Sequence, residues 1–315
     1  MKRHIGIFGG TPLTADAPKV GVMRFGALGD LALALPFLRA LTIKPIVLTS
    51  PPGRELLSDE FDNFVVMEGK SILSQARFVC DLRRQSLDVL IDLQSNDRSR
   101  IMSRLAGAGK KFERTFAPRS LPATEAWQKI LDESGLLGSI DLTFIPKPKN
   151  YIVLNAGSSL QWVSKRLPDH KWHEVSALLR ERFGLPFVLT GSPDEREYLS
   201  HLARNIIGPV ENRAGQTSLQ ELKHLLAEAF LTISTDSAAM HISAAMKTPT
   251  IGIFGATNWV RSAPFGPWAK VVYDRVRYPD GCPPDKNMQT PGPYYEHVDI
   301  ADALQSLARY CVFIH

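Results

Sequence analysis

The most distinctive polar residues lie where a short apolar strand runs into a helix. In "RFGALGDLALALPFL", Gly26 and Gly29 precede Asp30 and a strongly apolar segment. Small residues let a ligand approach the backbone, and the first turn of a helix offers unpaired N–H groups to an anion. Asp30 is explained equally well as the N-cap of that helix. The glycine spacing does not match Gly-x-Gly-x-x-Gly, so it gives no support for a dinucleotide site.

Two further strand ends carry polar or cationic residues. "VLIDLQSNDRSR" places Gln94 where an open parallel sheet forms its binding crevice, although Asp92, Gln94 and Asn96 are more often simple turn formers. "YIVLNAGSSLQWVSKRLPDHKW" ends a strand in Gly and Ser residues and delivers Lys165 just before a helix. Backbone amides followed by a lysine suit a diphosphate, and a surface lysine beside a helix start is the alternative.

The last two strand ends hold carboxylates next to helix starts. In "FVLTGSPDEREYL", Glu195 follows Gly191 and could accept both hydroxyls of a ribose, although stabilisation of the helix dipole alone explains it better. In "LTISTDSAAMHISAAMKTPTIGIFGATN", a strand ends at Asp236 and Ser237, and a helix of small residues carries His241 one turn later. This arrangement suits a phosphate or a sugar hydroxyl. Taken singly, Asp236 is more often an N-cap and His241 a packed histidine.

Alternating strands and helices must position these residues. Short β-rich runs alternate with helical patterns nearly throughout, which indicates parallel sheets covered by helices in an α/β fold. Strands are expected at 20–25, 45–49, 64–68, 89–93, 151–155, 186–190, 231–235, 250–254 and 269–273. Helices are expected at 30–41, 71–86, 97–107, 169–183, 194–205, 218–227 and 237–247, with a last one within 298–311. The Pro- and Lys-rich "IPKPKN" predicts a linker, so we place one domain at 1–148, with an extension at 1–18, and a second at 149–315.

Length and composition exclude several classes of protein. A chain of 315 residues with 44% apolar and 22% charged residues is an ordinary globular protein, long enough for two domains. Three scattered cysteines and no clustered histidines predict neither disulfides nor a metal centre, and no Gly-x-Ser-x-Gly elbow indicates a serine hydrolase. No apolar run reaches the roughly 18 residues of a membrane span, and the N-terminus does not match a signal peptide. We therefore expect a cytoplasmic protein without cofactor or metal.

Basic residues gather in the segment 77–119, which holds ten Lys and Arg against five acids. An ordinary solvated helix face is one interpretation, and a surface for an anionic ligand or a membrane headgroup is the other. Aromatic residues do not interleave with these charges, so nucleic acid is not expected as a partner.

Five segments in this order resemble glycosyltransferase family 9, the ADP-heptose:lipopolysaccharide heptosyltransferase family. They are "RFGALGDLALALPFLRAL", "DVLIDLQSNDRSRIMSRLAGA", "SKRLPDHKW", "LTGSPDERE" and "STDSAAMHISAAMKTPTIGIFGATN". The resemblance covers about residues 20 to 268 and implies the GT-B fold, two Rossmann-like domains that face each other across a cleft. It further implies an inverting, metal-independent transfer of heptose from ADP-heptose to a lipopolysaccharide core acceptor.

The resemblance also assigns roles to residues of this sequence. Asp30 falls on the general base, which takes the proton of the acceptor hydroxyl. Residues expected to bind the donor diphosphate and sugar are Lys165, Asp236, Ser237, Ala238 and His241. Residues expected to bind the nucleotide are Gly191, Glu195, Thr217 and Leu219. Residues expected in the acceptor part of the cleft are Gly26, Gly29 and Gln94.

The expected partners are a nucleotide sugar, a phosphorylated glycolipid acceptor and the inner face of the inner membrane, to which the protein would be peripheral. Ala238 departs from the family, which usually has glycine after Asp-Thr or Asp-Ser, and its methyl group would limit the approach of a phosphate or sugar. Two alternatives follow: a GT-B transferase that uses another nucleotide sugar, and a catalytically silent module that binds nucleotide sugars or glycolipids. Retention of Asp30 and Lys165 argues against silence.

Overall fold

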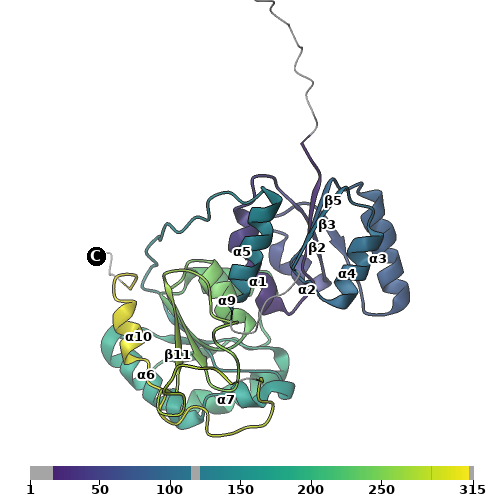
Figure 1. The fold of residues 1–315 in the computed structure, drawn as a ribbon. Helices are drawn as coiled ribbons and strands as arrows, with labels where there is room; N and C mark the ends of the chain where they lie inside the picture. The colour runs from purple at the N-terminus through teal and green to yellow at the C-terminus, as the bar shows by residue number, and fades with distance from the viewer. Residues whose placement is uncertain (1–16, 115–120, 285, 312–315) are drawn as a thin grey trace, which may run out of the picture.

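The computed structural model describes residues 17–114, 121–284 and 286–311. Most of the expected extension at 1–18, and Arg119 of the basic segment, lie outside the described residues. Two parallel sheets lie side by side, each with helices on both faces (Figure 1). This architecture confirms the predicted fold class of two Rossmann-like domains.

The N-terminal sheet has five parallel strands in the order β3-β2-β1-β4-β5. Its strands are β1 (Val20–Met23), β2 (Ile46–Thr49), β3 (Phe64–Val66), β4 (Val89–Asp92) and β5 (Lys110–Glu113). Its helices are α1 (Leu28–Arg39), α2 (Pro51–Leu57), α3 (Ile72–Arg84), α4 (Asp97–Leu105) and α5 (Ala123–Ser134). The central strand β1 is buried along its whole length, as expected for a strand covered on both faces.

The C-terminal sheet has six parallel strands in the order β11-β10-β9-β6-β7-β8. Its strands are β6 (Ile152–Asn155), β7 (Phe187–Leu189), β8 (Val210–Asn212), β9 (Leu231–Thr235), β10 (Thr250–Phe254) and β11 (Ala269–Tyr273). Its helices are α6 (Asp169–Phe183), α7 (Arg196–Leu202), α8 (Leu219–Glu228), α9 (Ala238–Ala245) and α10 (Ala301–Ser306). Short 3-10 turns are η1 (Leu160–Lys165), η2 (Pro193–Glu195) and η3 (Ala203–Asn205).

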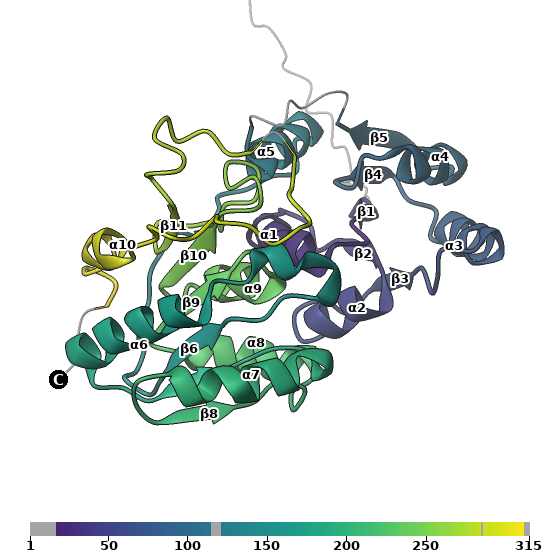
Figure 2. The same ribbon diagram turned by 90° about the horizontal axis from the view of Figure 1, so that it is seen from below.

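Helices α1 and α9 join the two domains (Figure 2). One apolar cluster contains Leu31 and Phe37 of α1 together with Ala239, Ile242 and Ala245 of α9. The small residues of α9 allow it to lie close to α1 as well as to β9 and β10. As a result, the start of α1 and the start of α9 lie at the same junction between the domains. On the far face of the N-terminal sheet, α3 and α4 form an outer layer (Figure 2).

All nine predicted strands and every predicted helical segment contain regular structure, with ends shifted by a few residues. Helix α1 begins at Leu28 rather than at residue 30, and the expected helix at 194–205 is α7 flanked by η2 and η3. Five elements were not predicted: α2, α5, the edge strands β5 and β8, and the 3-10 turn η1. The domain boundary at residue 148 falls in the irregular chain between α5 and β6 and stays a prediction. Within the described ranges, no helix is long and apolar enough to cross a bilayer.

Candidate functional site

A cavity of about 460 Å³ opens beside the junction of the two domains. Its floor is the carboxyl end of the C-terminal sheet, and Leu28 of α1 contributes a wall from the other domain. Eight of the residues predicted from sequence line it: Lys165, Gly191, Glu195, Thr217, Leu219, Asp236, Ser237 and Ala238. They come from four separate segments of the chain, which the parallel topology gathers at one edge of the sheet.

Lys165 and Asp236 form an ion pair at this cavity. Nζ of Lys165 lies 2.9 Å from Oδ2 of Asp236 and donates a longer hydrogen bond, of 3.3 Å, to the backbone oxygen of Asp236. Both side chains are mostly buried, with 19% and 12% of their surfaces exposed. The ammonium group is also 5.2 Å from the centre of the Trp162 ring. The lysine is thus held at the cavity rather than free in solvent, and a phosphate oxygen would find a preplaced positive charge.

The start of α9 faces the same cavity. Its N-cap is Ser237, not Asp236, so the N-cap interpretation of Asp236 is wrong. The Ser237 hydroxyl makes no capping bond; it accepts a hydrogen bond of 2.9 Å from the Asn155 side chain and lies 3.0 Å from the Ser234 hydroxyl. Within the part of the chain that the structure describes, no side chain caps the first amides of α9, and these N–H groups are available to an anion.

Glu195 is buried between two glycines. Its Oε2 accepts a hydrogen bond of 2.6 Å from the backbone N–H of Ser192, which closes a capping box around η2. A Cβ atom at Gly157 would lie 2.6 Å from the Glu195 carboxyl carbon, and one at Gly191 would lie 2.8 Å from Oε2. Both positions leave room only for hydrogen. The carboxylate is fixed in place at the cavity wall, as a group that selects ribose hydroxyls would need to be.

Asp30 lies just outside the cavity lining, in the first turn of α1. The N-cap of α1 is Ala27, so Asp30 is not the N-cap. Its Oδ2 forms an ion pair with Nη2 of Arg24, whose Nη1 donates a hydrogen bond of 3.1 Å to the backbone oxygen of Leu93. Arg24 lies over the Trp127 ring at 5.2 Å. Burial lowers the pKa of Arg24 and the pairing with Asp30 opposes that effect. The Asp30 side chain keeps 39% of its surface exposed, so the hydroxyl group of a bound molecule can contact it.

His241 connects the two halves of the site. It is buried at the α1–α9 contact, where a Cβ atom on Gly29 would lie 3.0 Å from its Cδ2. Among the described residues, its Nδ1 has no hydrogen-bond partner. Burial lowers the pKa of His241, while the charges of Asp236 and Asp30 act in the opposite direction. A Cβ atom on Gly29 would also lie 3.4 Å from Cα of Ala238, so the turn that carries Asp30 and the start of α9 meet at the same junction.

The remaining predicted residues have mainly structural surroundings. Gln94 accepts a long hydrogen bond, 3.3 Å, from the N–H of Phe25, and a Cβ built on Gly26 would have no described residue within 4 Å apart from its chain neighbours. Asp92 is fully buried and accepts bonds from Gln94 N–H, Ser95 N–H and the Ser99 hydroxyl. Burial raises the pKa of Asp92. The turn-forming interpretation of this strand end is confirmed, and Gln94 stays a predicted acceptor residue at the loop beside Asp30.

Sequence reasoning did not select several residues that the structure brings to the site. Trp162, Leu222 and Leu28 line the cavity, and Arg24 pairs with Asp30. Arg24 lies six residues before Asp30, so an arginine at the end of β1 was a visible signal. Trp162 precedes Lys165 by three residues in the same short segment, which was also a visible signal. Leu28 and Leu222 carry no signal, because only the packing of α1 and α8 brings them to the cavity.

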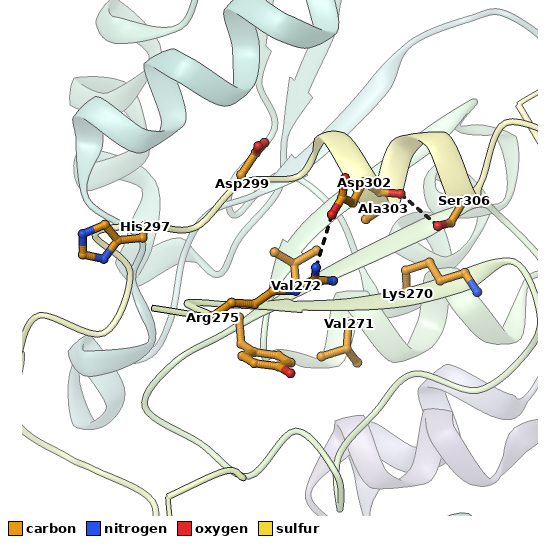
Figure 3. A pocket seen from close by; sticks show the side chains of 10 residues that line it. Lys270, Val271, Val272, Arg275, His297, Asp299, Asp302, Ala303 and Ser306 are labelled. Carbon is orange, nitrogen blue, oxygen red and sulfur yellow. Dashed lines mark hydrogen bonds and ion pairs between the residues drawn. The ribbon is translucent and has the colours of Figure 1, made fainter. Parts of the chain in front are cut away.

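A smaller cavity of about 170 Å³ lies far from these residues, between β11 and α10 (Figure 3). Arg275 and Asp302 pair across it at 3.2 Å, and the Ser306 hydroxyl donates to the backbone oxygen of Asp302 at 2.9 Å. None of the predicted residues lines it. Over the part of the chain that the structure describes, no cluster of three or more His, Cys, Asp or Glu side chains could hold a metal ion.

Comparison with known proteins gives the same family as the motifs. Residues 120–292 match the model of Glycosyltransferase family 9 (heptosyltransferase). A segment of 153 residues is 34% identical to lipopolysaccharide heptosyltransferase 3 of Escherichia coli K12 and covers 48% of this chain but 40% of that protein. The chain therefore spans only about two fifths of this curated relative.

Solved structures show the same fold. The glycosyl transferase family 9 protein of Veillonella parvula superimposes with a TM-score of 0.73 at 16% identity, over 95% of this chain and 98% of that chain. E. coli heptosyltransferase WaaC with ADP gives a TM-score of 0.68 at 19% identity, over 93% of this chain and 100% of that chain. Together with the family match over more than half of the sequence, these findings show that the chain belongs to glycosyltransferase family 9.

Proposed function

We propose that the chain is an inverting glycosyltransferase that transfers a heptose from ADP-heptose to a lipopolysaccharide core acceptor. The observation that carries the proposal is the single cavity in which Lys165, Asp236, Glu195 and the open start of α9 converge, with Asp30 next to it on α1. The name of the E. coli relative, lipopolysaccharide heptosyltransferase 3, supports the sugar and the acceptor. The name of the WaaC structure with ADP-2-deoxy-2-fluoro heptose supports the donor.

In the proposed reaction, the acceptor hydroxyl oxygen attacks the anomeric carbon from the side opposite the diphosphate. Asp30 accepts the hydroxyl proton as the new C–O bond forms. The bond between the anomeric carbon and the diphosphate oxygen breaks, its electron pair stays on ADP, and the configuration inverts. Arg24 holds one oxygen of Asp30, which leaves the other to face the acceptor.

The growing charge on the leaving diphosphate needs compensation. We infer that Lys165 and the amides at the start of α9, which border the same cavity, supply it, and this electrostatic role does not call for a metal ion. The pairing of Lys165 with Asp236 keeps the ammonium group in position before the donor arrives. We place Glu195 against the ribose and Thr217 and Leu219 against the nucleoside. Turnover should therefore persist when EDTA is added.

Ala238 is the feature that favours a different donor. Its methyl group lies at the first position of α9, beside the predicted diphosphate site. A larger or differently shaped sugar would meet this group before the amides. A transferase with the same fold and base but another nucleotide sugar is therefore the second candidate function.

Thermal-shift measurements with ADP, UDP, GDP, CMP and their sugar conjugates test the donor, because a ligand that binds only the folded state raises the melting temperature. Selective stabilisation by ADP and ADP-heptose is the expected result. Selective stabilisation by UDP or GDP conjugates would replace the donor and keep the mechanism. A protein that none of these compounds stabilises would contradict nucleotide-sugar transfer altogether.

The acceptor is proposed as a phosphorylated glycolipid, bound by the N-terminal domain while the protein is peripheral to the inner face of the inner membrane. The support is the excess of basic residues in segment 77–119. This segment includes α4 and β5 and the end of α3, all on the N-terminal sheet.

A further inference from the structure

Exposed aliphatic side chains concentrate on the outer layer of the N-terminal domain. Among the described residues, eleven large hydrophobic side chains are exposed, and four of them lie on α3 and α4. Ile72 is 86% exposed and Leu73 62%, at the first turn of α3; Ile101 is 56% exposed and Leu105 47%, on α4. These two helices contact each other and lie on the side of the sheet away from the C-terminal domain (Figure 2). Burial within the chain does not explain why these residues are apolar.

Arginines alternate with the aliphatic residues on the same two helices. On α4, Arg98, Ile101 and Leu105 are spaced three and four residues apart and share one face. On α3, exposed Arg77 lies one turn beyond Leu73. Within the described ranges, Arg77, Arg98 and Arg104 form no ion pair, so their charge is not neutralised by the protein itself.

The two helices form one surface rather than two. The side chain of Arg83, near the end of α3, donates a hydrogen bond of 2.7 Å to the backbone oxygen of Leu105 at the end of α4. Both helices start at the carboxyl edge of the N-terminal sheet, which is the edge that carries Asp30. The most exposed aliphatic residue, Ile72, therefore lies at the end of the surface nearest to the predicted acceptor site.

We propose that the α3–α4 face, defined by Ile72, Leu73, Ile101 and Leu105 with Arg77, Arg98 and Arg104, docks on an anionic phospholipid bilayer. Aliphatic side chains would enter the boundary between headgroups and acyl chains, and the arginines would bind the phosphates above it. A purely electrostatic surface would not need exposed isoleucine and leucine, and a purely apolar surface would not need unpaired arginines. The inference rests on the proposed function, in which the acceptor is carried by a membrane.

Co-sedimentation with lipid vesicles tests the docking. The protein is expected to bind vesicles of one part phosphatidylglycerol to two parts phosphatidylcholine far better than pure phosphatidylcholine. The double variant Ile72→Ser/Leu73→Ser should lower the partition coefficient about tenfold, because both side chains lose their apolar contact with lipid. The matched control is Val276→Ser, since Val276 is 67% exposed on the other domain and should leave binding unchanged.

A charge variant separates the electrostatic part. Arg98→Ser should weaken binding to the anionic vesicles about fivefold and make it less sensitive to salt, because one arginine near such a surface contributes about 1 kcal/mol. Arg204→Ser is its control, since Arg204 is exposed on the C-terminal domain.

The chain provides its own labelling sites. Cys80 is exposed on α3 and Cys282 is exposed on the C-terminal domain. An environment-sensitive fluorophore on Cys80, in a Cys282→Ser background, should shift to shorter wavelength on anionic vesicles. The same fluorophore on Cys282, in a Cys80→Ser background, should not shift.

Three results would overturn the docking proposal: wild-type binding by the Ile72→Ser/Leu73→Ser variant, equal shifts at both labelled cysteines, or no vesicle binding by the wild-type protein. If the protein instead formed dimers that the aliphatic variant dissolved, the α3–α4 face would be a contact between copies. Stabilisation by ADP is measured without vesicles, so a failure of docking is distinguishable from a failure of the proposed nucleotide-sugar chemistry.

Discussion

At the scale of single residues, Asp30 combines two properties that a base needs. One of its oxygens is held by a buried arginine, which fixes the orientation of the carboxylate, and more than a third of the side chain is open to solvent. Arg24 is itself fixed by the Leu93 carbonyl and the Trp127 ring, and Trp127 also donates a hydrogen bond of 3.1 Å to that carbonyl. The proposed base is thus positioned by a chain of contacts that reaches α5.

Replacing Asp30 with asparagine tests its role directly. Asp30→Asn keeps the size of the side chain and an oxygen for Arg24 but removes the proton acceptor. Turnover should fall at least about a hundredfold, within the range general-base catalysis contributes. Donor binding, followed as the thermal shift with ADP, should stay as in the wild-type protein. Full turnover with normal donor binding would show that another group takes the proton.

His241 predicts a pH dependence of stability. Burial lowers its pKa in the folded protein, whereas a histidine in the unfolded chain titrates near about 6.5. As the pH falls below about 6.5, the unfolded chain binds a proton that the folded chain does not, so the free energy of unfolding decreases. His241→Gln removes this contribution. Urea unfolding without ligand, at about pH 7.5 and about pH 5.5, should show a smaller loss of stability on acidification for the variant. Equal losses would contradict the burial of a neutral imidazole.

At the scale of elements, two loops of the C-terminal domain pack at their glycines. Gly157 follows β6 and Gly191 follows β7, and both leave space for the Glu195 carboxylate of η2. No part of this arrangement depends on a positive φ angle at these two positions; it depends on the absent side chain. The position of the carboxylate is therefore a property of how β6, β7 and η2 fit together.

Gly157→Ala should displace Glu195 and weaken nucleotide binding while the protein still folds. A methyl group at Gly157 would lie 2.6 Å from the carboxyl carbon, so the carboxylate must move. Loss of its charged hydrogen bonds would raise the Kd for ADP by about tenfold or more. Isothermal titration measures this effect. Gly69→Ala is the control, because its Cβ would have only ordinary contacts, 3.6 Å from the Ser74 hydroxyl oxygen. Unchanged ADP binding by Gly157→Ala would remove Glu195 from the nucleotide site.

Charged or short elements could not be predicted from sequence, whereas α5 was missed although its buried Ala123, Trp127, Ile130 and Leu131 follow a helical period. Edge strand β5 reads "KKFE" and β8 reads "VEN", and neither has the apolar run that marks a buried strand. Helix α2 begins with two prolines and contains Gly53, which favour a turn by local preference. Tertiary packing against α8 overrides that preference. For short or charged segments, tertiary packing rather than local sequence therefore decides which element forms.

The site was predictable as a set of segments but not as a set of contacts. Polar residues that follow the predicted strands could be assigned to the site, because binding residues gather at the carboxyl edge of a parallel sheet. The pairing of Lys165 with Asp236 joins positions 71 residues apart, and the presence of Leu28 in the cavity needs the packing of two domains. Neither contact can be predicted from local sequence.

At the scale of the whole molecule, a buried lysine ties the two domains together. Lys223 of α8 is 1% exposed and pairs with Asp59 at 2.8 Å and with Glu60, both just after α2. Glu60 also binds Arg39, whose Nη1 donates a hydrogen bond of 2.6 Å to the backbone oxygen of Ala245 in α9. Burial acts to raise the pKa of Glu60, but the hydrogen bonds and charges of Arg39 and Lys223 hold this pKa below its usual range. The network links α1, α2, α8 and α9.

Lys223→Met should destabilise the protein by about 3 kcal/mol, because it removes the buried cation of Asp59 and leaves Glu60 with Arg39 alone. Lys44→Met is the matched control: Lys44 pairs with Asp62 at 2.6 Å, but both side chains are more than half exposed. That variant should change the free energy of unfolding by about 0.5 kcal/mol or less. Urea unfolding measures both. Equal effects of the two substitutions would show that the domains do not depend on Lys223.

Leu28 has a consequence for any attempt to recombine members of this family. The proposed donor cavity is not formed by the C-terminal domain alone, because Leu28, the first residue of α1 in the other domain, contributes to its wall. A chimera that takes α1 from a relative in order to accept a new glycolipid would also change the residue that α1 contributes to the proposed nucleotide-sugar cavity. If the proposed sites are right, exchanging α1 is expected to change acceptor and donor preferences together, and changing only the acceptor preference would require Leu28 to be kept.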